Sequence, residues 1–88
     1  MTKPLLNNRD EIVWWITNET ADRVVDKILE DRQRIAELEN IGKQIMELAW
    51  RDHKSMDELA LLKRADKIFC LGEQLEESCD TPIKWTEE

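Results

Sequence analysis

Apolar residues recur every three or four positions over most of this chain, the spacing that places them on one face of a helix. The clearest stretch runs from residue 35 to residue 75, where two apolar stripes flank a polar hinge. The first stripe comprises Ile35, Leu38, Ile41, Gly42, Ile45, Leu48 and Ala49, and the second comprises Leu61, Leu62, Ala65, Ile68, Phe69, Gly72 and Leu75. These patterns predict two amphipathic helices.

The hinge, residues 51–54, is short and wholly polar, so the two helices should fold back on each other as an antiparallel hairpin. His53 lies in this hinge, and we expect it to be a solvated turn residue. Ser55 and Glu58 have the S-x-x-E spacing of a capping box, which predicts the start of the second helix.

Both glycines of the chain fall on the apolar stripes. A glycine inside a helix costs roughly 1 kcal/mol relative to alanine, so its presence there favours close helix approach. Folding the chain about its hinge would place Gly42 near Ala65 and Gly72 near Ile35. The sequence therefore predicts that small residues face larger ones across the hairpin.

The N-terminal part of the chain predicts a short helix after a loose segment, residues 1–7. Asn8 reads as an N-cap with Glu11 three residues on. The five apolar residues 12–16 suit either a helix or a strand, and the cap before them favours helix. Residues 17–20 prefer caps to helix interiors, so we expect a break, a kink or a fresh helix start there.

The apolar stripe that resumes at Ala21 continues into Ile35, in register with a heptad repeat. It predicts one unbroken helix from Ala21 to Trp50, about 45 Å long at 1.5 Å per residue. A rod of that length with one shorter partner helix leaves apolar surface uncovered, which a second copy of the chain would cover. The predicted fold is all-α: an antiparallel helical hairpin of a long helix and a second helix, with a short N-terminal helix, dimerising into a helical bundle.

The chain of 88 residues is short enough for one small domain, residues 1–88. Residues 80–88 should form a loose or docked acidic tail, because Pro82 ends the last helix. No apolar leader follows Met1 and no run is long enough to cross a membrane. Cys70 and Cys79, nine positions apart on one helix, would be too distant to bridge. We therefore expect a cytoplasmic protein with reduced thiols and no membrane contact.

The net charge of −7 disfavours direct binding to nucleic acids, which depends on a basic footprint. Asp22, Asp26 and Glu30 form a like-charged row at steps of four, which we interpret as a solvated face. All-helical nucleotide pyrophosphohydrolases bind magnesium with glutamates at E-x-x-E spacing, and Glu73 and Glu76 have this spacing without further motif residues. Such a pair arises readily by chance in an acidic helical protein. No catalytic residue, metal ligand set or cofactor is predicted.

The aromatic residues are skewed toward tryptophan, with four Trp, one Phe and no Tyr. Tryptophan is enriched at the energetic centres of protein interfaces, and acidic residues at an interface rim steer a basic partner. The predicted binding residues are Trp14, Trp15, Trp50, Trp85, Glu73, Glu76 and Glu77. The alternative for the tryptophans is that they fill a thin core.

These features favour a small acidic regulator or inhibitor, not an enzyme, that occupies a surface of a partner protein with basic character. The alternative is a nucleic-acid mimic of the anti-restriction or anti-CRISPR kind, which blocks a DNA- or RNA-binding protein with carboxylates spaced like phosphates. A remote alternative is a small all-helical, metal-dependent nucleotide hydrolase.

Overall fold

The computed structural model describes residues 6–32 and 35–79, and most of these residues are helical. In chain order the elements are α1 (Arg9–Trp14), the π-helical turn η1 (Trp15–Glu19), α2 (Thr20–Glu30), α3 (Ile35–Ala49) and α4 (Glu58–Glu77). The segment between α3 and α4, residues 50–57, is called the hinge segment below.

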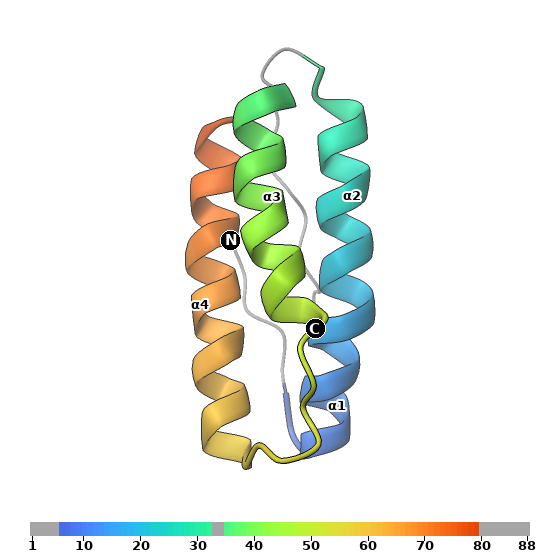
Figure 1. Ribbon diagram of the computed structural model, residues 1–88, viewed down its shortest axis with the longest axis vertical. Coiled ribbons are helices and arrows are strands. Elements are labelled where there is room, and N and C mark those ends of the chain that lie inside the picture. The colour runs from blue at the N-terminus through green and yellow to red at the C-terminus, as the bar shows by residue number, and fades with distance from the viewer. Residues whose placement is uncertain (1–5, 33–34, 80–88) are drawn as a thin grey trace.

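The elements form three packed rods (Figure 1). The first rod consists of α1, η1 and α2, which follow one another without interruption. The second rod, α3, packs against both α2 and α4, and α1 also contacts α4. The protein is therefore a compact three-helix assembly, all-α as predicted over the part of the chain that the structure describes.

The predicted unbroken helix from Ala21 to Trp50 is wrong. Helix α2 ends at Glu30, Asp31 has extended backbone angles, and α3 begins at Ile35. The charged residues around this point offer no apolar side chains to bury, so the chain can turn there. Packing α2 against α3 buries Ala21, Val24 and Leu38 of the stripe that a second copy was expected to cover, while Val25, Leu29 and Ile35 stay exposed.

The first rod contains a π-helical turn where the sequence predicted a break, a kink or a new helix start. The buried positions along this rod are Ile12, Trp15, Ile16, Thr20, Ala21, Val24 and Lys27, and four of them, Ile12, Ile16, Thr20 and Val24, lie four residues apart. On a regular helix of 3.6 residues per turn, a residue four positions further on lies about 40° further around the helix axis. A π turn has more residues per turn, which offsets this rotation. The Thr17 hydroxyl donates to the Val13 carbonyl at 2.7 Å within the turn. Residues 12–16 are helical, which confirms the preference for helix over strand.

The core lies along the axis between the three rods. Its buried members are Ile12, Trp15, Ile16, Val24, Leu38, Ile41, Ile45, Ala49, Leu61, Ala65, Ile68, Phe69, Leu71 and Leu75. The rings of Trp15 and Phe69 stack with centroids 4.8 Å apart, which joins the first rod to α4. Within the described ranges, no helix combines the length and apolar content needed to span a bilayer.

Two helix starts have side-chain caps. Asn8 accepts a hydrogen bond from the Glu11 amide at 2.9 Å, which confirms the predicted N-cap. At the start of α4 the cap is Asp57, which accepts from the Ala60 amide at 2.8 Å. The predicted capping box at Ser55 is therefore wrong, because an aspartate two residues later is at the helix boundary and is an equally good cap.

Gly42 is a close-approach position, but its neighbour differs from the predicted one. A Cβ atom at Gly42 would lie 2.5 Å from Ile28 Cδ1 and 3.2 Å from Val24 Cγ1, both on α2. The predicted neighbour was Ala65 on α4. The sequence contained the signal for close packing, but the break after α2 brings a different helix to that face. Gly72 is buried on α4.

Candidate interaction surface

The structure separates the predicted binding tryptophans into surface and core residues. Trp14 and Trp50 are exposed, at 56% and 63% of their surface. Trp15 is 2% exposed and belongs to the core, so it is not available to a partner on the surface of this chain. Trp85 lies outside the described residues. Neighbours on a helix point about 100° apart, which explains how Trp14 and Trp15 reach opposite environments.

The predicted acidic residues lie in the last turns of α4. Glu73 and Glu77 are exposed and Glu76 is half-buried. Figure 1 places this end of α4 beside the start of α3, and the Ser78 hydroxyl donates to Glu37 of α3 at 3.0 Å. Trp14 is the last residue of α1 and Trp50 the first residue of the hinge segment, and Figure 1 shows α1 toward the opposite end of the bundle. The predicted tryptophans and acids therefore do not form one surface.

Trp14 instead borders a hollow on the outer side of the first rod, which we call the acidic hollow. It has a volume of about 490 Å³ and is lined by Trp14, Asn18, Glu19, Asp22, Arg23 and Asp26. All six residues come from one continuous rod, so a rigid element positions them. Trp14, Asp22 and Asp26 lie at multiples of four residues in the sequence, where the acids by themselves predict only a solvated face.

The charges of the acidic hollow are partly paired. Arg23 contacts Glu19 at 2.8 Å, an ion pair one turn apart on the helix. Asp22 and Asp26 are exposed and have no ion-pair partner among the residues that the structure describes. Like charges at this spacing repel each other and destabilise the free helix slightly. The hollow thus combines an exposed indole with two carboxylates that have no ion-pair partner within residues 6–32 and 35–79.

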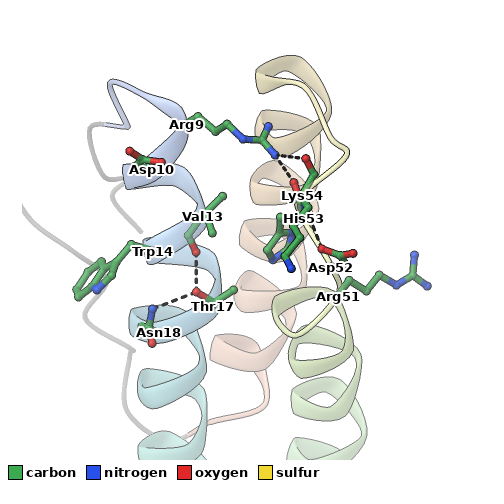
Figure 2. A pocket seen from close by; sticks show the side chains of 10 residues that line it. All are labelled: Arg9, Asp10, Val13, Trp14, Thr17, Asn18, Arg51, Asp52, His53 and Lys54. Atoms are coloured by element: carbon green, nitrogen blue, oxygen red, sulfur yellow. Dashed lines mark hydrogen bonds between the residues drawn. The ribbon is translucent and has the colours of Figure 1, made fainter.

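A second depression, the hinge groove, lies between the first rod and the hinge segment (Figure 2). It has a volume of about 520 Å³ and is lined by Arg9, Asp10, Val13, Trp14, Thr17, Asn18, Arg51, Asp52, His53 and Lys54. Figure 2 shows Arg9 crossing the gap to the carbonyl groups of His53 and Lys54. The Trp14 side chain points away from the hinge segment. Arg9 therefore fastens α1 to the hinge segment.

His53 is buried, at 6% exposure, so the expectation of a solvated turn residue is wrong. Its Nδ1 atom lies 2.7 Å from an Arg64 guanidinium nitrogen, and its Nε2 atom lies 3.2 Å from the Ala49 carbonyl oxygen. Because a guanidinium can only donate, Nδ1 accepts and Nε2 carries the proton. The hinge segment folds over one end of the core and buries the His53 ring. The two hydrogen bonds compensate the cost of burying its nitrogen atoms.

Burial lowers the pKa of Arg64 below its usual value, and the positive charge of Arg51 lowers it further. Arg64 belongs to α4, His53 to the hinge segment and Ala49 to the end of α3, so one hydrogen-bonded chain joins these three parts. Both ring nitrogens of His53 are engaged in this chain. The arrangement holds the hinge segment in place and leaves no ring nitrogen directed at a nucleophile.

We expect His53→Leu to lower the free energy of unfolding by about 1–3 kcal/mol, because Arg64 would keep a partly buried donor with no acceptor. His53→Gln, which retains both an acceptor and a donor, should cost less. Urea denaturation followed by circular dichroism measures both values. Equal stability of His53→Leu and the unsubstituted protein would show that the His53–Arg64 bond contributes nothing.

Among the described residues, no group of three or more His, Cys, Asp or Glu side chains is placed to hold a metal ion. Cys70 on α4 and Cys79 beyond its end form no disulfide with each other. A scan against protein-family models finds no family that matches the chain, and searches of curated proteins and of solved structures find no match either. The candidate site therefore depends on the geometry of this chain alone.

Proposed function

We propose that this protein is a small regulator or inhibitor that acts by occupying a basic surface on a partner protein. The observation that carries the proposal is the exposed Trp14 at the edge of the acidic hollow. A rigid helix presents this indole, so little conformational freedom would be lost on binding. Tryptophan is the residue type most enriched at the centres of protein interfaces.

The distribution of charge supports a basic partner. The net charge of the chain is −7, and acids flank Trp14 on the first rod. Glu73 and Glu77 add exposed carboxylates at the far end of α4. Acids around an apolar contact raise the rate of association with a basic surface and make it sensitive to salt. Trp14 would mainly slow dissociation.

The proposal is tested by comparing what immobilised variants retain from a lysate of cells that produce the protein. We expect a partner that the unsubstituted protein and Trp50→Ala retain and that Trp14→Ala loses, by about tenfold or more for a residue at an interface centre. Trp50→Ala is the matched control, because it removes a second exposed tryptophan. Mass spectrometry quantifies the retained proteins. Equal retention by all three variants would contradict the proposal.

The same experiment separates the proposal from the nucleic-acid mimic. A mimic would lose its partner on charge reversal of Glu73, Glu76 and Glu77, would be displaced completely by added DNA or RNA, and would be nearly indifferent to loss of Trp14. That combination of results would replace the proposed function with the mimic.

An organising hairpin of α3 with α4 stays a prediction, and so does dimerisation. The reason for a dimer is weaker because α2 packs against α3.

A further inference from the structure

We propose that the hinge segment is a pH-sensitive element, which opens when His53 takes up a proton. The His53 ring is buried at 6% exposure, and its Nδ1 atom accepts a hydrogen bond from Arg64 that only a neutral ring can accept. Histidine is the side chain whose charge ordinarily changes between pH 5 and 8, and His53 is the one histidine of the chain. A single group therefore links the hinge segment to mild acid.

The two ring nitrogens of His53 respond differently to protonation. Nε2 lies 3.2 Å from the Ala49 carbonyl oxygen and carries a hydrogen in both the neutral and the protonated ring, so this bond persists. Nδ1 lies 2.7 Å from a guanidinium nitrogen of Arg64, and a proton on Nδ1 would leave two donors facing each other. Protonation therefore breaks the bond from the hinge segment to α4 and leaves the bond to α3 intact.

The charges around His53 oppose a positive ring. Burial lowers the pKa of Arg64, and the positive charge of Arg51 lowers it further, so cations already crowd this end of α4. No charged residue of α3 lines the hinge groove among the residues that the structure describes. The charged groups that surround the ring are Arg64 from α4, Arg9 and Asp10 from α1, and Arg51, Asp52 and Lys54 from the hinge segment. Four positive charges thus stand against two negative ones.

The two nearby carboxylates do not take the place of Arg64. Within residues 6–32 and 35–79, neither Asp10 nor Asp52 has a hydrogen bond or ion pair to the His53 ring, and Asp52 accepts from the Lys54 amide at 2.9 Å. Coulomb energy falls with distance, so repulsion by the guanidinium in contact exceeds attraction from carboxylates that do not touch the ring. The closed hinge segment therefore favours the neutral form of His53.

Loss of the Arg64 contact would release more than one side chain. Arg9 donates to the carbonyl groups of His53 and Lys54, which Figure 2 shows across the hinge groove. Met56, also in the hinge segment, packs against the core. When the hinge segment opens, α1 loses this attachment, the hinge groove loses one wall, and the core beneath Met56 meets water.

The open and closed forms of the hinge segment bind different numbers of protons. The closed form contains a neutral ring, whereas the open form leaves the ring in water, where a histidine has a pKa of about 6.5. The open form therefore binds more protons and gains population as the pH falls. Between pH 7.5 and 5.5, one such proton raises the ratio of open to closed hinge by at most about tenfold, while carboxylates in water stay mostly ionised.

Amide hydrogen exchange, measured by nuclear magnetic resonance at pH 7.5 and 5.5, tests the inference on the full chain without a histidine tag. The reporter is the Met56 amide, which donates to the His53 carbonyl at 3.3 Å. Its protection factor, corrected for the intrinsic effect of pH on exchange, should fall about fivefold or more at pH 5.5. The Ile45 amide inside α3 is the internal reference and should change less than about twofold. An unchanged Met56 amide, or an equal fall at Ile45, would overturn the inference.

Two variants identify the groups responsible. His53→Gln keeps an acceptor and a donor but does not titrate, so its Met56 protection factor should change less than about twofold. Arg64→Met removes the guanidinium, so protonation no longer breaks a bond, and the change should shrink to less than about threefold. Circular dichroism checks that both variants are folded. Full pH dependence in His53→Gln would assign the effect to other groups, and full pH dependence in Arg64→Met would show that the His53–Arg64 bond does not hold the hinge segment. Either result would also overturn the inference.

Discussion

Trp15→Ala should lower the free energy of unfolding by about 3–5 kcal/mol, the cost of removing a large aromatic side chain from a packed core. Trp15 is 2% exposed and stacks on Phe69, so the substitution leaves a cavity between the first rod and α4. A domain of this size has a total stability of about 4–13 kcal/mol. The melting temperature should therefore fall by about 12 °C or more.

The neighbouring residue is the matched control for this substitution. Trp14 is 56% exposed, and Trp14→Ala should change the free energy of unfolding by less than about 0.5 kcal/mol. Trp15→Phe, which keeps an aromatic ring next to Phe69, should lie between the two alanine variants. Thermal unfolding followed by circular dichroism measures all three. Similar melting temperatures for Trp14→Ala and Trp15→Ala would show that the assignment of one residue to the surface and one to the core is wrong.

Gly42→Leu should lower the free energy of unfolding by about 1–3 kcal/mol despite the better helix propensity of leucine. Even a Cβ atom at this position would lie 2.5 Å from Ile28 Cδ1 and 3.2 Å from Val24 Cγ1. Gly42→Ala is the control, because the flexible end of Ile28 can move away from one methyl group. Its gain in helix propensity of about 1 kcal/mol should offset much of the contact. A higher melting temperature for Gly42→Leu than for the unsubstituted protein would contradict close packing at Gly42.

A second substitution shows which helix Gly42 faces. In the Gly42→Leu background, Ile28→Ala should restore part of the lost stability, because it makes room on α2. Ala65→Gly on α4, the neighbour that the hinge register had predicted, should restore none. Denaturant unfolding of the three single and two double variants, together with the unsubstituted protein, gives the two coupling energies. Rescue by Ala65→Gly alone would favour the predicted hairpin register over the observed packing.

Local pattern predicted most of the helical segments of this protein, although not the break between α2 and α3. Apolar spacing of three and four predicted helix over α3 and α4, and Asn8 with Glu11 predicted the start of α1. Such signals involve residues within a turn or two of each other, so a sequence contains them in full. The glycine on the α3 stripe likewise indicated a close contact before its partner was known.

The partner of each helix face was decided by tertiary structure. Whether the chain continues as one helix beyond Glu30 or starts a separate helix at Ile35 depends on whether the apolar face of α2 gains more by packing on α3 than the helix loses by ending. The balance between these two free energies involves residues far apart in the chain. It therefore cannot be inferred from a heptad register that is continuous from Ala21 to Ala49. The break after α2 changed the neighbour of Gly42 from Ala65 to Ile28, and it weakened the main reason for a dimer.

The candidate site shows the same division. Composition left open whether the tryptophans bind a partner or fill a thin core, and only packing separates exposed Trp14 from buried Trp15, one residue apart. Burial of His53 also required the hinge segment to fold over the core, where Arg64 from α4 supplies its hydrogen bond. The spacing of Trp14, Asp22 and Asp26 was visible in the sequence. Only the structure shows that they line one hollow on the continuous rod of α1, η1 and α2.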